Sequence, residues 1–281
     1  MTGRTARRRV VRVSLDGGAG PRADLLAAEE PLGIRIGGQA VTLTMRTPGD
    51  DLDLVAGFLV SEGIVRSAAD IAELRICSGE RCGHDHSDDG EDLGNVADVT
   101  LAPGIVLRAG QRRNFLTSSA CGVCGKTSIA ELSVPGSYDV SRDAARVTPE
   151  VLAGLPDALR AAQRVFDRTG GLHAAGLFTA AGDLLAVRED VGRHNAVDKI
   201  VGWALRAGRL PLSGCVLLVS GRASFELVQK AVLAGIPVLA AVSAPSSLAA
   251  ELADEAGLTL VGFLRGGSMN VYAHPHRIAA S

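Results

Sequence analysis

The sequence of 281 residues has little lysine, little net charge and no long apolar run. Only Lys126, Lys199 and Lys230 are lysines among its 29 basic residues, the others being arginine. Acidic and basic side chains nearly cancel, at a formal net charge of −2, while 47% of the residues are hydrophobic. This balance is typical of a globular protein with a substantial core, and it gives no indication of a nucleic-acid partner.

No segment has the features of a membrane span or of a secretory signal. The longest uncharged run, residues 231–250, is interrupted by Pro237 and Pro245 and divides into a helix end, a strand, a loop and a helix start. The basic N-terminal stretch MTGRTARRRVV is not followed by an apolar run. We therefore expect a cytoplasmic protein without a membrane partner.

Five cysteines, an odd number, favour reactive, metal-bound or buried thiols over disulfides in a reducing compartment. Cys77, Cys82, His84 and His86 have the spacing C-x4-C-x-H-x-H, which zinc could use. They border or lie in the acidic segment 78–94, whose polar composition favours an exposed loop. We expect this loop to be solvated, and we predict no metal site.

The first half of the chain predicts a flexible tail at residues 1–8 and a small α+β lobe at residues 9–145. Strands are expected at residues 9–15, 40–45, 74–77 and 96–101. One helix is expected to begin at Asp50 and Asp51 and to end at Gly63. This lobe contains the segment with the two closely spaced cysteines near its end.

The second half, residues 146–281, alternates strands with helices. Strands are expected at residues 173–178, 184–187, 215–220, 236–242 and 258–263, and helices at 156–169, 190–207, 225–234 and 246–256. This alternation is typical of an α/β fold whose partly parallel sheet is covered by helices. Ligands of such sheets bind beyond the carboxyl ends of the strands, so the turns after strands are the places to search.

The stretch SSACGVCGKTS, residues 118–128, holds Cys121 and Cys124. As half of a zinc site it would need ligands from the distant acidic loop. As a thioredoxin-like redox pair it lacks a convincing preceding strand and a nearby proline. As a phosphate loop it lacks the first glycine, because Ala120 stands there. A reactive thiol fits better, since glycines expose the sulfur, while hydroxyls and Lys126 favour its thiolate form. Two structural cysteines remain the alternative.

The zinc-dependent nucleoside deaminases also combine a CxxC motif with an α/β sheet. Their H-x-E motif has no counterpart here, because Ala174 and Ala175 follow His173, and no proline precedes Cys121. The catalytic glutamate is absent, so deamination is not expected. His173, alone at the start of a predicted strand, is interpreted as structural.

Three predicted strand-to-helix turns are rich in groups that bind anions. In the first, Asp190 is the expected N-cap of a helix. Its first turns hold five polar residues: Arg193, His194, Asn195, Asp198 and Lys199. The second turn, with Ser220, Gly221 and Arg222, offers backbone amides and a guanidinium group. The third is SAPSS at residues 243–247. Together they predict one sheet edge that binds a large phosphate-bearing ligand.

The motifs SSACGVCGK, TGGLHAAG, REDVGRHNAVDK, VSGRASFELVQKA, SAPSSLA and VGFLRGGSMNVYAHPHRI together resemble the formate dehydrogenase accessory sulfurtransferases, the FdhD family. The resemblance extends from about residue 11 to residue 278. It implies a small N-terminal α+β lobe and a C-terminal lobe with a cytidine-deaminase-like α/β fold. It also implies transfer of persulfide sulfur from a cysteine desulfurase to the molybdenum bis(molybdopterin guanine dinucleotide) cofactor, for the benefit of formate dehydrogenase.

The resemblance also implies roles for individual residues. Cys121 matches the persulfide-forming cysteine of the family and Cys124 its partner. The cofactor-binding stretch matches Phe263, Leu264, Arg265, Gly266, Gly267 and Ser268. With the turns described above, the expected binding set also includes Arg193, His194, Ser220, Gly221 and Arg222. The cofactor is expected as a bound substrate rather than a permanent group, and a homodimer is the family expectation.

Two other functions remain open at this point. A non-catalytic carrier of the molybdenum cofactor would bind its ligand and keep its function when Cys121 becomes Ala. A dithiol oxidoreductase would cycle a disulfide between Cys121 and Cys124, would need both equally and would turn over general thiols.

Overall fold

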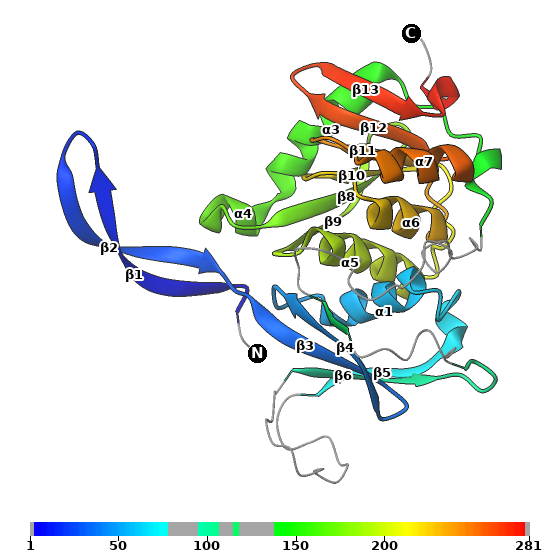
Figure 1. The fold of residues 1–281 in the computed structure, drawn as a ribbon, viewed down its shortest axis with the longest axis horizontal. Helices are drawn as coiled ribbons and strands as arrows, with labels where there is room; N and C mark the ends of the chain where they lie inside the picture. The colour runs from blue at the N-terminus through cyan, green and yellow to red at the C-terminus, as the bar shows by residue number, and fades with distance from the viewer. Residues whose placement is uncertain (1–2, 78–94, 107–114, 118–137, 279–281) are drawn as a thin grey trace.

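The computed structural model describes residues 3–77, 95–106, 115–117 and 138–278. These residues form a projecting two-stranded arm and a body that contains a five-stranded and a six-stranded sheet (Figure 1). Helices lie between the two sheets and on the outer face of the larger one (Figure 1). The predicted mixed α/β class is therefore confirmed.

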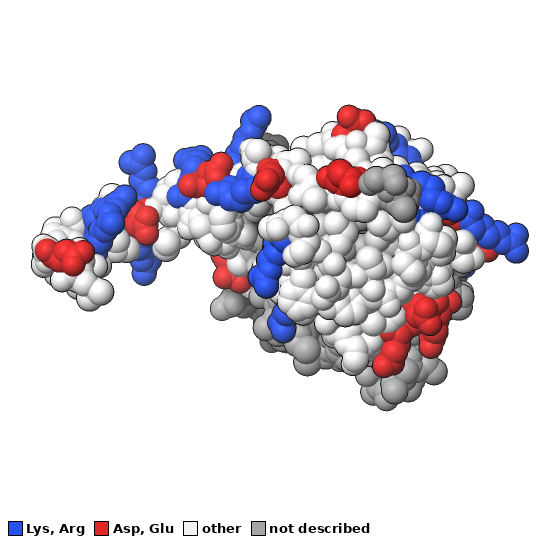
Figure 2. All heavy atoms as spheres, turned by 90° about the horizontal axis from the view of Figure 1, so that it is seen from above, with Lys and Arg blue, Asp and Glu red and all other residues white. Residues whose placement is uncertain are grey.

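The arm is an antiparallel hairpin of β1 (Thr5–Ser14) and β2 (Gly18–Ala27), which extends away from the body (Figure 1). The predicted flexible tail, residues 1–8, is wrong for residues 5–8, because these pair with β2 in a continuous ladder. The sequence analysis also missed β2, whose residues are mostly exposed and lack an alternating apolar pattern. Basic side chains are spaced along the arm (Figure 2).

The five-stranded sheet has the strand order β5-β6-β3-β4-β7. Its strands are β3 (Glu30–Ile36), β4 (Gln39–Arg46), β5 (Ile71–Cys77), β6 (Val96–Leu101) and β7 (Phe115–Thr117). Helix α1 (Asp51–Ser61) packs on this sheet through a shared apolar cluster. Its N-cap is Asp50, as predicted, but the carboxylate of Asp50 binds Arg4 instead of capping the helix.

The six-stranded sheet has the order β13-β12-β11-β10-β8-β9. Its strands are β8 (His173–Thr179), β9 (Leu184–Asp190), β10 (Cys215–Val219), β11 (Val238–Ala241), β12 (Thr259–Arg265) and β13 (Ser268–Ala273). Strands β10, β11 and β12 are parallel, which confirms the prediction of a partly parallel sheet. Strands β8 and β13 are antiparallel to their neighbours, and β13 was not predicted because most of its residues are exposed.

Helices cover both faces of this sheet. Helix α3 (Pro149–Ala162) packs on one face, and α5 (Arg193–Arg206), α6 (Phe225–Leu233) and α7 (Ser247–Ala256) pack on the other. The helix expected at residues 156–169 starts earlier and breaks at Gln163, so that α4 (Arg164–Thr169) is separate. None of the described helices is both long and apolar enough to cross a lipid bilayer.

One apolar core joins the two predicted lobes. Along β10, Val216 and Leu218 face α3, while Leu217 and Val219 face the opposite side. The cluster on that opposite side continues through α5 and α1 to the five-stranded sheet. The two sheets therefore lie on opposite sides of the helix pair α1 and α5, as Figure 1 also shows.

Two glycines allow α1 and α5 to cross at very short distance. A Cβ atom at Gly57 in α1 would overlap the carbonyl oxygen of Asp198 in α5, and a Cβ atom at Gly202 in α5 would overlap that of Asp53 in α1. Glycine is the residue that permits such a close approach of two backbones. The two halves of the chain are thus held together by direct backbone contact.

Buried ion pairs surround this crossing. Lys199 Nζ lies 2.7 Å from Asp190 Oδ2 and donates to the carbonyl oxygen of Thr47 at 2.8 Å. Asp198 pairs with Lys230 of α6 at 2.7 Å. A buried charge is stable only when it is paired and hydrogen-bonded, so these contacts fix the end of β4, the end of β9 and helices α5 and α6 relative to one another.

The described cysteines differ in state. Cys215 is a free thiol, whereas Cys77 is disulfide-bonded, contrary to the expectation of unpaired thiols. The disulfide leaves Cys77 without the thiolate that zinc coordination requires. Cys82, His84 and His86 lie outside the described residues. Within the described ranges, no group of three or more metal-binding side chains is present.

We predict that Gly57→Ala and Gly202→Ala each destabilise the protein. The added methyl group forces the helices apart, and such overpacking costs at least about 1–3 kcal/mol. Gly154→Ala is the matched control, because Gly154 also lies inside a helix but a Cβ atom there meets nothing within 4 Å. In that variant the alanine is expected to stabilise by about 0.5–1 kcal/mol. Urea unfolding measures all three, and equal changes in all three would refute the close crossing.

We also predict that Lys199→Met is strongly destabilising. The substitution leaves the Asp190 carboxylate, which is fully buried, without its cation. Breaking a buried pair in this way costs about 3–5 kcal/mol. Arg142→Ala, which breaks an ion pair on the surface, should leave the urea midpoint unchanged. A Lys199→Met midpoint equal to that of Arg142→Ala would contradict the assigned pairing.

Candidate functional site

The carboxyl ends of four parallel strands meet at one edge of the six-stranded sheet. Because β8 is antiparallel to both β9 and β10, strands β9, β10, β11 and β12 all end at this edge, and β8 begins there. The three turns singled out in the sequence therefore lie side by side. This edge is the candidate functional site.

The turn after β10 is held against the start of β8. The Ser220 hydroxyl accepts a hydrogen bond from the Ala174 amide at 2.9 Å, and the Ser220 amide donates to the Ala174 carbonyl at 3.0 Å. The Arg222 side chain is exposed, and no ion pair to it is found in the described part of the chain. Ser220 thus anchors the turn, while Arg222 remains available to a ligand.

The turn after β10 is also joined to the turn after β11. The Ser243 amide donates to the carbonyl oxygen of Gly221 at 3.4 Å, and the Ala223 amide donates to the carbonyl of Ala244 at 3.2 Å. Beyond it, the Phe263 amide donates to the Ser243 carbonyl at 3.1 Å. Backbone hydrogen bonds thus connect the ends of β10, β11 and β12.

The start of α5 differs in two ways from the prediction. Its N-cap is Gly192, while Asp190 ends β9 and accepts from the Gly192 amide at 2.8 Å. Lys199 was expected to favour an anionic ligand together with Arg193 and His194, but it is buried, as are Asn195 and Asp198, and all three bind other parts of the protein. Only Arg193 and His194, of the five polar residues in these turns, are left near the sheet edge.

Asn195 and its neighbours face the other lobe because of the helix crossing. The Asn195 amide donates to the Met45 carbonyl at 2.8 Å and to Asp190 Oδ1 at 3.0 Å. These bonds attach the first turn of α5 to the end of β4. The sequence shows that polar residues are concentrated in this helix start, but it does not show which side of the helix packs against the five-stranded sheet.

His194 bridges the first turns of α5 and α6. Its Nε2 atom lies 2.8 Å from Glu226 Oε2 and 3.1 Å from Ser224 Oγ. A Ser-His-acid catalytic triad places serine and acid on opposite ring nitrogens, whereas both are here on Nε2, so this cluster is not a triad. Ser224 occupies the N-cap position of α6, but its side chain binds His194 rather than a backbone amide of the helix.

Charge around Glu226 favours its ionised form. Burial opposes ionisation, but the hydrogen bond from His194 and the positive charges of His194, Lys230 and Arg193 outweigh it and lower the pKa of Glu226. Its second oxygen, Oε1, is buried and has no hydrogen-bond partner among the described residues. The buried Nε of Arg193 likewise has none in the described part of the chain.

His173 and Arg193 meet over Gly221. A Cβ atom at Gly221 would lie 3.3 Å from both Nδ1 and Cε1 of His173 and 3.9 Å from Cδ of Arg193. Burial first, and then the positive charges of Arg193 and His194, lower the pKa of His173 against the opposing charge of Asp190. Its imidazole is therefore neutral near pH 7, and the described residues offer its ring nitrogens no hydrogen-bond partner.

The sequence interpretation of His173 as structural overlooked this position. A lone histidine before an apolar strand carries no signal that the strand is antiparallel and so begins at the ligand edge. Glu226 was overlooked for a similar reason, because its pairing with His194 joins two helices far apart in sequence. The sequence signals that could have found them are their places next to glycine-containing turns and inside the motifs TGGLHAAG and VSGRASFELVQKA.

The stretch from Phe263 to Ser268 forms the end of β12, a tight turn and the start of β13. Gly266 and Gly267 have φ angles of 58° and 74°, as the two central residues of a type I′ turn require. Phe263 also has a positive φ of 53°, a strained conformation for a bulky residue. Leu264 is fully buried against the α3 side of the sheet, so its side chain is part of the core and not of the edge surface.

Arg265 lies with its guanidinium 5.6 Å from the centre of the Phe263 ring. Its side chain and that of Ser268 are exposed. The Ser268 hydroxyl donates to the Arg265 carbonyl oxygen at 3.2 Å, which closes the turn. The turn thus presents a cation next to an aromatic ring at one end of the edge.

Cys121 and Cys124 lie outside the described residues. On the N-terminal side of that segment, Thr117 ends β7 and is paired with Thr44 of β4. The Thr44 hydroxyl donates to Asn195 Oδ1 at 3.4 Å, which places the end of β7 near the first turn of α5. On the C-terminal side, the buried Arg277 donates to the Val140 carbonyl at 2.6 Å.

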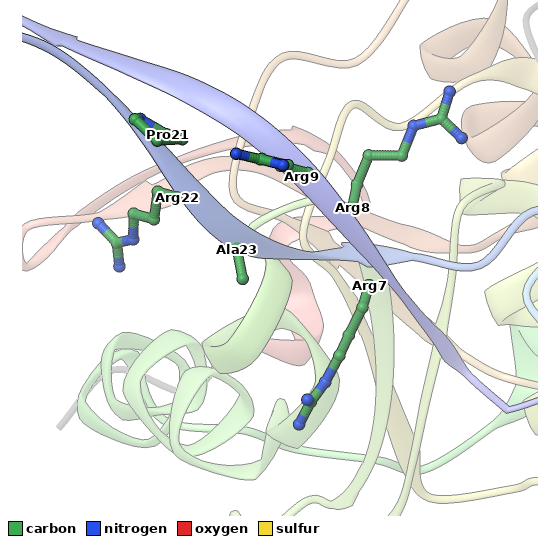
Figure 3. Close-up of a pocket in the computed structure, with 6 residues that line it drawn as sticks. All are labelled: Arg7, Arg8, Arg9, Pro21, Arg22 and Ala23. Carbon is green, nitrogen blue, oxygen red and sulfur yellow. The ribbon is translucent and has the colours of Figure 1, made fainter.

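A second basic region lies on the arm. Arg7, Arg8, Arg9 and Arg22 line a shallow hollow there (Figure 3), and no ion pair to them is found in the described ranges. The hollow is the open face of a two-stranded ribbon and has no titratable or nucleophilic group besides arginine. The candidate functional site is therefore the sheet edge and not the arm.

Sequence comparison relates the chain to known proteins over nearly its whole length. The model of the FdhD/NarQ family matches residues 27–279. A sulfur carrier protein FdhD of Streptomyces avermitilis is 60% identical over 277 residues, which cover 98% of this chain and 96% of that protein. The protein of the same name from Mycobacterium tuberculosis is 55% identical over 275 residues, or 98% of each chain. That of Sulfolobus acidocaldarius is 43% identical over 94% of each chain.

The fold is also that of a solved structure. A candidate formate dehydrogenase accessory protein from Desulfotalea psychrophila superposes with a TM-score of 0.74, at 23% sequence identity, over 98% of this chain and 99% of that one. At this identity the likeness concerns the fold alone. The family model and the relatives above 50% identity go further, and they show that the chain belongs to the FdhD/NarQ family.

Proposed function

We propose that the protein is a sulfurtransferase that carries sulfur as a persulfide on Cys121 and delivers it to a molybdenum bis(molybdopterin guanine dinucleotide) cofactor. The donor is a cysteine desulfurase and the beneficiary a formate dehydrogenase. The names of the relatives, sulfur carrier protein, support the sulfur-carrying part of this proposal. The fold shared with a candidate formate dehydrogenase accessory protein is compatible with the second part.

The observation on which the proposal mainly rests is where the chain enters the cysteine segment. Strand β7 ends at Thr117, beside Thr44 and hence beside the first turn of α5. Cys121 follows four residues later, and four residues span at most about 14 Å. Cys121 therefore comes only four residues after a described residue, Thr117, that lies beside the helix carrying Arg193 and His194 at the edge. A sulfur donor and an anionic acceptor can meet there.

The first chemical step is a thiol–persulfide exchange. The Cys121 thiolate attacks the terminal sulfur of the desulfurase persulfide, a bond forms between the two sulfurs, and the desulfurase cysteine leaves as a thiolate. The electrons and sulfur atoms balance without an added oxidant. In the second step the Cys124 thiolate attacks the inner sulfur of the Cys121 persulfide, the bond between the inner and outer sulfur breaks, and the outer sulfur leaves as hydrosulfide for the molybdenum of the substrate cofactor. A Cys121–Cys124 disulfide remains, and a cellular dithiol reductant returns both cysteines to thiols before the next round.

The cofactor is proposed to lie along the sheet edge as a substrate. From β9 to β12 the edge crosses four strand spacings, or about 19 Å, which suits an extended ligand better than a single phosphate. Arg193, Arg222 and Arg265 are distributed over this length. Guanidinium groups bind phosphates through paired hydrogen bonds, and the first turns of α5 and α6 add unpaired backbone amides.

The finer assignments of fold and assembly belong to the same proposal. We infer a cytidine-deaminase-like arrangement for the six-stranded lobe, supported by its parallel strands β10, β11 and β12 with helices on both faces. His173 is followed by two alanines rather than by the deaminase glutamate, which is compatible with a binding function. A homodimer in the cytoplasm is the expected state.

We predict that Cys121→Ser abolishes sulfur loading. Serine cannot ionise near neutral pH or form a persulfide, so the protein should fold and gain no sulfur after incubation with a cysteine desulfurase and cysteine. Intact-protein mass spectrometry measures the gain of one sulfur atom, which dithiothreitol removes. Cys124→Ser is the matched control and should still be loaded.

The same experiment distinguishes the alternatives. If only Cys124 acquires sulfur, the roles of the two cysteines are reversed. If neither acquires sulfur while formate dehydrogenase is still activated, the protein is a carrier. If both are equally essential and general thiols are turned over, it is a dithiol oxidoreductase.

We predict that GDP binds at the sheet edge and that Arg222→Ala weakens its binding by about 1.5–3 kcal/mol, the range for a hydrogen bond to a charged group. Isothermal titration calorimetry measures the affinity. Arg142→Ala, whose side chain is exposed in a 3-10 helix away from this edge, is the control. Unchanged GDP affinity in a variant with alanine at Arg193, Arg222 and Arg265 would refute the assignment.

A further inference from the structure

We propose that His173 and Arg193 form a subsite for a diphosphate group, and that binding of the diphosphate places a proton from solvent on the imidazole of His173. This inference rests on the proposed nucleotide edge and makes its chemistry specific. It assigns a ligand-contacting role to His173, which the sequence alone indicated to be structural.

The first support is convergence. His173 starts β8, Gly221 follows β10 and Arg193 starts α5, yet the ring of His173 and the side chain of Arg193 both lie within 4 Å of the position of a Cβ atom at Gly221. The missing side chain at Gly221 leaves room for two polar groups side by side. A residue with a Cβ atom there would press on the His173 ring at 3.3 Å.

The second support is the lack of partners. In the described part of the chain, no hydrogen-bond partner is found for the ring nitrogens of His173 or for the buried Nε of Arg193. His173 is half-buried, whereas the Nε of Arg193 is fully buried, and buried polar atoms are nearly always hydrogen-bonded in native proteins. A ligand with several acceptor oxygens would supply bonds to both side chains at once, and a diphosphate has such oxygens on two neighbouring phosphorus atoms.

The charges around His173 explain why its imidazole is neutral without a ligand and gains a proton when a diphosphate binds. Arg193 and His194 of α5 disfavour its imidazolium form, Asp190 at the end of β9 favours it, and burial disfavours it most. Arg222 adds a positive charge on the adjacent turn, while Glu226 of α6 is paired with His194. In the free protein the pKa of His173 is therefore low and the ring neutral near pH 7.

A bound diphosphate reverses the net electrostatic effect of the surroundings on the imidazolium form of His173. Its negative charges favour the imidazolium, so the pKa of His173 rises on binding. Protons are taken up between the free and the bound pKa. Affinity is then highest at acidic pH and falls as the pH rises through the bound pKa, because the protonated ring that contacts the ligand is lost.

The test follows the Hε1 resonance of His173 in the full-length protein by NMR, as a function of pH, with no ligand, with inorganic pyrophosphate and with GDP. His173→Gln assigns the resonance. We expect its titration midpoint to move upward with either ligand. Calorimetry in buffers of different ionisation enthalpy should show proton uptake that His173→Gln reduces, with a three- to tenfold loss of pyrophosphate affinity at pH 6 and little loss at pH 8.5.

His276→Gln is the matched control, because His276 is an exposed histidine in the 3-10 helix Pro275–Arg277. It should leave the affinities and the proton uptake unchanged. The wild-type titration needs no variant to fold, so the inference stays testable if His173→Gln is unstable, with the resonance then assigned by its response to Arg193→Gln.

The outcomes separate this inference from the proposed function. Tight binding of both ligands with an unmoved His173 midpoint overturns the inference and leaves the nucleotide edge intact. If pyrophosphate raises the titration midpoint of His173 but GDP does not bind, the diphosphate subsite is supported and the proposed binding of guanine nucleotides is refuted. Absence of binding by both ligands overturns the subsite, whereas the sulfur loading of Cys121 is measured independently.

Discussion

The close crossing of α1 and α5 is the contact on which the rest of the structure depends. Gly57 and Gly202 let each helix meet a backbone carbonyl of the other, at a separation that no side chain would permit. This contact turns two sheets from different halves of the chain into layers around one core. It also presses the start of α5 against the end of β4, where Asn195 and Lys199 bind backbone carbonyls.

The candidate site is a consequence of this arrangement. The six-stranded sheet collects the ends of β9 to β12, and the crossing brings the end of β7, which leads into the cysteine segment, to the same corner. The strand that leads into the cysteine segment and the candidate site therefore belong to different sheets. Their relative position is held by buried ion pairs such as that of Asp190 with Lys199, which are costly to break.

The electrostatics of the edge divide its polar residues into two groups. His194, Glu226 and Ser224 satisfy one another and join α5 to α6. His173, Arg193 and Arg222 have no such partners among the described residues and remain for a ligand. Under the proposed function, the guanidinium groups of Arg193 and Arg222 would hold an anionic substrate at this edge.

Much of the local structure follows from the sequence alone. The strand at residues 96–101 has the predicted bounds, and the strands before α6 and α7 are short apolar runs that are buried in the sheet. Hydrophobic periodicity and turn residues determine such elements, because the conformation of a short strand or helix depends mainly on residues that are near in sequence. Strands β2 and β13 were missed, since exposed hairpin strands are stabilised by pairing rather than by burial. Only the tertiary structure decided that β8 is antiparallel to its neighbours, which brings His173 to the candidate site. It also decided that Asn195 and Lys199 face the other lobe. Both features depend on which surfaces of the two halves pack together, and the pattern of apolar and polar residues along the sequence does not specify which surface packs against which.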